Sequence, residues 1–141
     1  MAWQTPKLDW AIRRAPDGTY LGDYFNAADY MRMKGNLEHI HELAGPLWPA
    51  FDLQEMPDVT VESLGLPRYL NGLEHNIDII ADHTFRPSAL EVTKTWRANT
   101  APPGPDDMNR LERSIFLLYS TVRSRVELRP KLAFAFKGDE F

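Results

Sequence analysis

The sequence contains no cysteine among its 141 residues. This excludes disulfides, thiol chemistry and zinc sites built on cysteine. Long apolar runs are missing as well, since none approaches the roughly 20 residues that a membrane-spanning helix requires. The first residues also lack the long apolar core of a signal peptide. We therefore expect synthesis in a cytoplasm, no membrane partner and a single domain without covalent staples.

Positive charge is also scarce, because 16 lysines and arginines face 20 acidic residues, for a net charge of -4. Nucleic-acid binding by bulk electrostatics needs a clustered basic face, so no specific nucleic-acid partner is expected. One stretch departs from this balance, with six basic residues against Glu112 and Glu127: Arg110, Arg113, Arg123, Arg125, Arg129 and Lys131. A solvated helix face is the favoured interpretation of this stretch, ahead of an RNA or DNA site.

Proline and glycine mark the ends of three expected helices. The first is expected from Asn26, a good N-cap with Asp29 in the capping-box position, to about residue 44, where Gly45 favours a left-handed end. The second is expected over 67–83 and the third over 105–124, each with proline at its first position. Two long connections separate them, with a short turn of helix expected over 51–55.

The three expected helices repeat one pattern of 11 residues. The windows are Tyr30–Ile40, Leu70–Ile80 and Met108–Leu118, spaced by 40 and 38 residues. Positions one, four, eight and eleven are apolar in all three, which gives each helix one narrow apolar stripe. Such short helices do not persist alone, so the three stripes are expected to face one another. Polar positions also recur, including Asn36, Asn76 and Ser114 at position seven, which favours duplication over coincidence.

The two ends lie outside this repeat. Residues 1–25 show no sustained period, contain a turn signal at 16–18 and carry Trp3 and Trp10, which need a surface to cover, on this chain or on a neighbour. Apolar residues alternate over Leu132–Phe136, which predicts a short β-strand. The expected organisation is therefore an extended arm over 1–25, a mainly α three-helix domain over 26–125, and a C-terminal strand and tail over 126–141.

Several segments carry a family resemblance. The stretch 23–37, which includes Tyr24-Phe25-Asn26 and Asp29-Tyr30, resembles the "YFN-x-x-DYNRI-x-x-N" opening of small virion proteins in tailed phages of Firmicutes and other gut bacteria. Residues 3–10 resemble their "W-x-TPKT-x-W" start, 107–112 their "LNRIE" element, and 132–138 their "L-x-FRLG" ending. Met31 and the segment 134–136 depart from these patterns. The resemblance implies a structural role in the tail or its distal tip, with no catalytic residues to carry over.

The sequence gives little support for a metal site or a catalytic site. The strongest candidate is His39-x-His41 with Glu38 and Glu42, but histidines two apart on a helix point about 200° apart and do not share one metal easily. The carboxylate pairs of this chain are expected on solvated faces, and no nucleophile elbow, phosphate loop or dinucleotide fingerprint is present. We therefore expect no enzymatic activity, no metal and no cofactor, with a hydrolase using the histidines as the weakest alternative.

These observations lead to a non-enzymatic virion structural protein of a phage tail, in the tail tip, baseplate or fibre-attachment region. Its expected partners are copies of itself, in a symmetric oligomer, and other phage tail proteins. The predicted interface residues are apolar and lie mainly outside the helices: Trp3, Trp10, Phe25, Trp48, Trp96, Leu132, Phe134 and Phe136. The alternative is a soluble assembly chaperone or adaptor that binds a partner through an apolar helix face.

Overall fold

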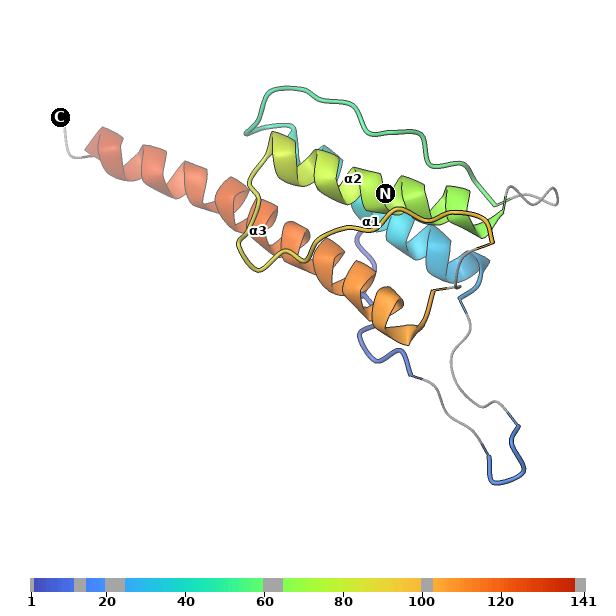
Figure 1. The fold of residues 1–141 in the computed structure, drawn as a ribbon. Helices are drawn as coiled ribbons and strands as arrows, with labels where there is room; N and C mark the ends of the chain where they lie inside the picture. Colours follow the sequence, from blue (N-terminus) through green and yellow to red (C-terminus); the bar gives the residue numbers. More distant parts are fainter. Residues whose placement is uncertain (1, 12–14, 20–24, 60–64, 100–102, 139–141) are drawn as a thin grey trace.

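The described part of the chain forms three helices in a computed structural model. They are α1 (Ala27–Ala44), α2 (Leu66–His83) and α3 (Pro105–Gly138) (Figure 1). The structure describes residues 2–11, 15–19, 25–59, 65–99 and 103–138, and over 129–138 it describes the backbone alone. The mainly helical, three-helix fold expected from the apolar pattern is therefore confirmed.

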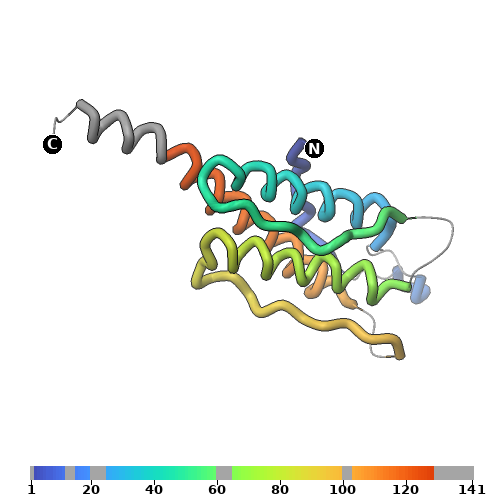
Figure 2. Tube along the Cα trace, turned by 90° about the horizontal axis from the view of Figure 1, so that it is seen from above, coloured from blue at the N-terminus to red at the C-terminus, as the bar shows by residue number. Residues whose placement is uncertain are grey.

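All three helices run in the same direction, and an extended segment returns the chain from the end of one to the start of the next (Figures 1 and 2). An 18-residue helix is about 27 Å long, so a parallel neighbour can begin only after the chain has travelled back that distance. The connections 45–65 and 84–104 contain 21 residues each, which is enough for an extended return. This geometry explains why both connections are long.

We call the extended segments straps. Strap 1 comprises residues 2–11, strap 2 residues 46–59 and strap 3 residues 85–99. Strap 2 runs back along α1 and α2, and strap 3 runs back beside α2 toward the start of α3 (Figure 2). Each strap therefore precedes one helix in the sequence, so that the repeating unit of the fold is a strap followed by a helix.

The apolar positions of the three windows form the core. At position eight, Leu37 and Ile77 are fully buried and Ile115 is 1% exposed. The core also includes the other apolar columns and continues along α3 to Val122. Burial of one such side chain contributes roughly 1.5–3 kcal/mol, so this stripe supplies most of the driving force for bringing the helices together.

The ends of α1 show one confirmed expectation and one correction. Asn26 is the N-cap, and its side chain and that of Asp29 bond reciprocally to each other's backbone N–H at 3.1 Å. Gly45, however, is right-handed with φ -51° instead of left-handed. The chain continues in a turn, in which the N–H groups of Leu47 and Trp48 both donate to the carbonyl of Ala44. These bonds satisfy that carbonyl without a left-handed residue.

The predicted C-terminal β-strand is wrong, because residues 132–136 continue α3 as helix. A strand needs a neighbour for its backbone groups, and no strand occurs within the described residues, whereas an established helix satisfies those groups locally. The short helical turn expected over 51–55 is also wrong, since that stretch is extended as part of strap 2. As a result α3 projects well past the ends of α1 and α2 (Figure 1).

Candidate functional site: the asparagine clamps and the outer face of the third helix

Asparagine side chains on the helices hold the backbone of the straps. In α1 the Asn36 side chain is buried, and its Oδ1 accepts a hydrogen bond from the Gln4 N–H at 2.8 Å. Its Nδ2 donates to the Gln4 carbonyl at 2.9 Å. One side chain thus satisfies both backbone groups of one strap residue, as a neighbouring β-strand would do.

Three further asparagines make the same pair of bonds, each to the N–H and the carbonyl of a single strap residue. The pairs are Asn76 with Gln54 at 2.7 and 2.9 Å, Asn71 with Trp96 at 2.7 and 2.9 Å, and Asn109 with Trp10 at 2.9 and 3.0 Å. We call these four contacts the asparagine clamps. They give the extended straps hydrogen-bond partners without a sheet.

The clamps follow the sequence repeat. Asn36 and Asn76 occupy position seven of their windows, whereas Asn71 and Asn109 occupy position two. Strap 1 is held by position seven of α1 and, six residues later, by position two of α3. Strap 1 therefore joins the first helix to the last, and it closes the arrangement that straps 2 and 3 begin.

Two ion pairs join the helices under straps 1 and 3. Each pair connects position three of one helix to position five of the helix packed beside it. Arg32 of α1 bonds to Glu112 of α3 at 3.1 Å. Arg110 of α3 bonds to Glu74 of α2 through two hydrogen bonds of 2.6 Å each. Both carboxylates are almost completely buried, and each also accepts from a strap.

The contact between α1 and α2 lacks the corresponding ion pair. Position three is Gly72 and position five is Lys34, so both partners of the expected pair are changed together. Strap 2 occupies the space, because a Cβ on Gly72 would lie 3.5 Å from the Met56 side chain. Lys34 pairs with Asp58 of the same strap. The third contact is thus closed by apolar packing and a surface ion pair.

Burial acts against the charges in these pairs. Burial raises the pKa of Glu112, and the nearby Arg32 guanidinium opposes that rise. For Arg110 burial favours loss of the charge, but the hydrogen bonds and the charge of Glu74 prevail and raise its pKa above the usual value. A buried, bidentate pair of this kind specifies one arrangement of the helices more than it adds net stability.

The tryptophans predicted as interface residues lie against their own bundle. Trp10 is 5% exposed, and the Trp3 ring stacks on Tyr119 of α3 with centroids 3.8 Å apart. The Trp96 indole N–H donates to Glu74 at 2.9 Å. Phe25 and Trp48 pack on the core. Their contact with a neighbouring subunit stays a prediction, as it does for Leu132, Phe134 and Phe136, whose side chains lie outside the described residues.

His39 and His41 contact different parts of the chain, and His41 and His83 both contact Phe51. His39 lies near the ring of Trp3, whereas His41 bonds to the Phe51 carbonyl of strap 2. His83 stacks on Phe51 with ring centroids 4.8 Å apart. Within the described ranges, no group of three or more histidine and acidic side chains is placed to hold a metal ion. The structure therefore does not bring His39 and His41 together as ligands.

The described basic side chains of α3 contact different partners. Arg110 is buried against Glu74, and Arg113 pairs with Glu91 at 3.0 Å. Arg123 pairs with Glu127 along the helix, and the Arg125 guanidinium lies 4.0 Å from the Phe85 ring centroid. Arg110 is therefore part of the bundle interior and not of a solvated face, and the side chains of Arg129 and Lys131 lie outside the described residues.

The outer face of α3 carries an exposed aromatic residue that sequence reasoning missed. Phe116 is 43% exposed, and Leu8 of strap 1, 49% exposed, lies beside it across a shared hollow. The signal was present in the repeat, because position nine is Glu38 in α1 and Asp78 in α2 but Phe116 in α3. This face is the clearest candidate for contact with another molecule.

Comparisons with protein-family models, curated proteins and solved structures find no significant match to this chain. A search of the described helices for a segment long and apolar enough to span a bilayer is likewise negative.

We predict that Asn36→Ala destabilises the protein by about 2–4 kcal/mol, because both backbone groups of Gln4 lose their partner in a partly buried position. Gln4→Ala is the matched control, since it alters an exposed side chain and leaves the clamped backbone unchanged. Its expected effect is within about 0.5 kcal/mol. Urea denaturation followed by circular dichroism measures both. Equal losses for the two variants would contradict the clamp.

The raised pKa of Glu112 leads to a pH-dependent prediction. The folded state binds this proton more tightly than the unfolded state, so the stability contributed by Glu112 is complete below its unfolded pKa and falls as pH rises through the higher folded value. Urea denaturation of the wild type and Glu112→Gln, at pH 4 and pH 7, measures this contribution. The stability of the wild type relative to the variant should decrease toward pH 7. An increase would show that Arg32 outweighs burial.

Proposed function

We propose that this chain is a non-enzymatic structural protein of a phage virion, located in the tail tip, baseplate or fibre-attachment region and assembled as a symmetric oligomer. The observation that carries the proposal is that residues of the resembling segments hold the fold together. The segments that resemble phage virion proteins contain Asn36, Asn109 and Glu112, and each of them holds a strap.

The buried polar groups support the same conclusion. Among the described residues the most deeply buried charged side chains are Glu74 and Glu112, and the oxygens of each accept bonds from an arginine and from a strap. A catalytic carboxylate needs an oxygen directed at a substrate in a pocket. These groups instead hold the fold in shape, which is what an assembly subunit requires.

An assembly chaperone or adaptor is the second candidate, and the exposed Phe116 beside Leu8 favours it specifically. Isolated apolar residues on a surface are ordinary, but an aromatic next to a hollow suits a helix or loop of a partner. The two candidates differ in one respect. A structural subunit remains in the finished particle, whereas a chaperone leaves it.

The test is mass spectrometry of purified virions from a phage that encodes this chain, with electron microscopy of the same particles. We expect the protein in stoichiometric amounts in intact particles and a density at the tail that fits the three-helix bundle. The matched control is a lysate fraction depleted of particles. Detection of the protein only in that fraction contradicts a structural role and supports the chaperone.

A further inference from the structure

One of the four clamp asparagines lies in a chemically reactive sequence. Asn71 is followed by Gly72. The residues that follow the other three clamp asparagines all carry larger side chains: Leu37, Ile77 and Arg110. The backbone nitrogen of the residue after an asparagine can attack the amide carbon of the asparagine side chain. A side chain on that following residue hinders the attack, and glycine has none. Asn71 is therefore the clamp at which this cyclisation meets the least steric hindrance.

The reaction needs no reagent other than water. The Gly72 nitrogen forms a bond to Cγ of Asn71, and the Gly72 proton leaves with the side-chain amino group as ammonia. A five-membered succinimide ring remains, and water opens it at either of its two carbonyl groups. One product is aspartate, and the other is isoaspartate, in which the backbone runs through the side-chain carbon. Both carry a carboxylate at neutral pH, which accepts hydrogen bonds but donates none.

Two features of the folded chain oppose this attack. Asn71 and Gly72 lie inside α2, where the Gly72 N–H is bonded to the carbonyl four residues back and is held by the helical backbone. The clamp fixes the side chain as well, because Oδ1 of Asn71 accepts from the Trp96 N–H at 2.7 Å and Nδ2 donates to the Trp96 carbonyl at 2.9 Å. The amide that would have to turn toward Gly72 is thus occupied by strap 3.

Both protecting features have a weak point. The N-cap of α2 is Gly65, which has no side chain to cap the helix, and the first turn of α2 contains no acidic residue. Strap 3 has one asparagine clamp in the described chain, because position seven of α3 is Ser114, whose single hydroxyl cannot bond both the N–H and the carbonyl of one residue. Release of Trp96 and fraying of the first turns of α2 therefore expose the reactive pair together.

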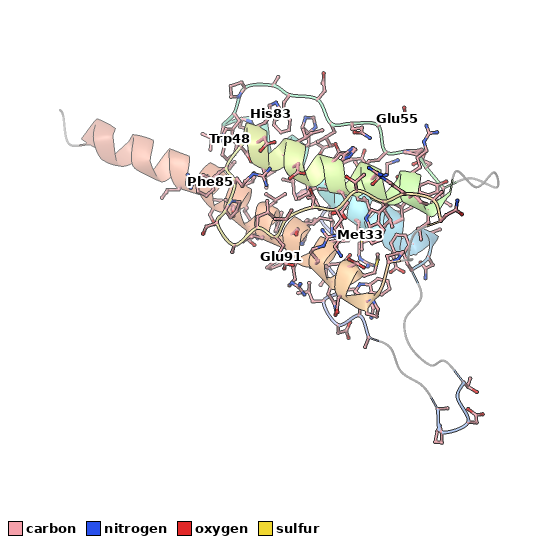
Figure 3. The ribbon with its side chains drawn as sticks, viewed as in Figure 1. Met33, Trp48, Glu55, His83, Phe85 and Glu91 are labelled. Atoms are coloured by element: carbon pink, nitrogen blue, oxygen red, sulfur yellow. The ribbon has the colours of Figure 1, made fainter. Side chains whose placement is uncertain are left out.

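Gly72 lies beneath strap 2, which passes alongside α2 where Figure 3 shows Glu55. A Cβ on Gly72 would lie 3.5 Å from Cγ of Met56 and 3.7 Å from the Glu55 carbonyl oxygen. These are ordinary van der Waals distances, so alanine fits at this position. Gly72→Ala therefore removes the reactive sequence while it leaves the clamp and both straps in place.

We propose that Asn71 is a self-modification site that strap 3 controls. While strap 3 is docked, its clamp protects the asparagine. When strap 3 undocks, cyclisation onto Gly72 converts Asn71 to aspartate or isoaspartate. The new carboxylate cannot donate to the Trp96 carbonyl, and it adds negative charge one helical turn from the buried Glu74. Chains whose strap 3 has undocked are thereby modified permanently. This inference is independent of the proposed place of the chain in a virion.

Peptide mass spectrometry of the purified full chain, incubated at neutral pH with and without urea, tests the proposal. We expect conversion of Asn71 to be at least about 100-fold slower in the folded chain than in urea, because the reactive state is open in about 1% of molecules or fewer. Trp96→Ala removes the indole bond to Glu74 and should raise the rate in the folded chain about 10-fold or more. Gly72→Ala should lose the reaction in the folded chain and slow it in urea.

The matched control is Trp48→Ala, which removes a partly buried tryptophan from strap 2 instead of strap 3. Urea denaturation gives the global stability of both tryptophan variants, so that their rates are compared at equal stability. At equal stability Trp48→Ala should raise the rate at Asn71 less than Trp96→Ala does. Equal acceleration overturns the proposal, because the reaction then follows global unfolding. Conversion of the folded wild type as fast as in urea overturns it as well.

The variant Asn71→Asp supplies one product directly. Hydrogen exchange of the strap 3 amides should become about 10-fold faster than in the wild type, because the Trp96 carbonyl has lost its donor. Circular dichroism checks that the helical content is kept. Unchanged protection of strap 3 in this variant contradicts a permanent effect of the modification.

Discussion

The hydrogen bonds from an asparagine side chain to the backbone of an extended strap are the interaction on which this fold depends. Three parallel helices need long returns, and a return that crosses a bundle leaves backbone N–H and carbonyl groups without partners. A β-sheet is the usual solution, but no strand is available in the described chain. Asn36, Asn71, Asn76 and Asn109 supply those partners from the helices.

Strap 1 connects the first helix to the last through contacts that are distant in the sequence. Strap 1 is clamped by Asn36 of α1 and by Asn109 of α3, and its Lys7 N–H donates to Glu112. These contacts span 32 to 105 residues of sequence. The strap is therefore a bridge between the first and last helices, in addition to their direct Arg32–Glu112 pair and their shared apolar core. Such long-range closure is expected to form late in folding.

The repeat also explains where the chain departs from symmetry. The α1–α2 contact has lost its ion pair through Gly72 and Lys34, and strap 2 fills the gap. The third helix has lost a clamp at Ser114 and gained Phe116. The first departure is compensated within the bundle, because strap 2 packs into the space left by the ion pair. The second leaves a hollow and an exposed ring on the outer face of α3.

Part of this structure could be predicted from the sequence. The apolar columns, the cap at Asn26 and the polar recurrence at position seven all follow local rules, because helix period and capping involve neighbours in the chain. The clamps could not be predicted, since the pattern shows an asparagine but not the backbone that it holds. The alternation at Leu132–Phe136 misled because it suits a strand locally, whereas α3 continues as helix. Phe116 could be identified only from the difference between the copies at position nine, where the other two helices carry an acidic residue.

Native-state hydrogen exchange of the strap amides tests the central claim most directly. The N–H groups of Gln4, Trp10, Gln54 and Trp96 lie outside the helices, yet each is bonded to a clamp. We predict opening free energies for these four amides within about 1–2 kcal/mol of those in the helical core, while unclamped strap amides such as that of Val92 exchange quickly. Exchange of the four clamped amides at the rate of an unstructured chain would contradict the account.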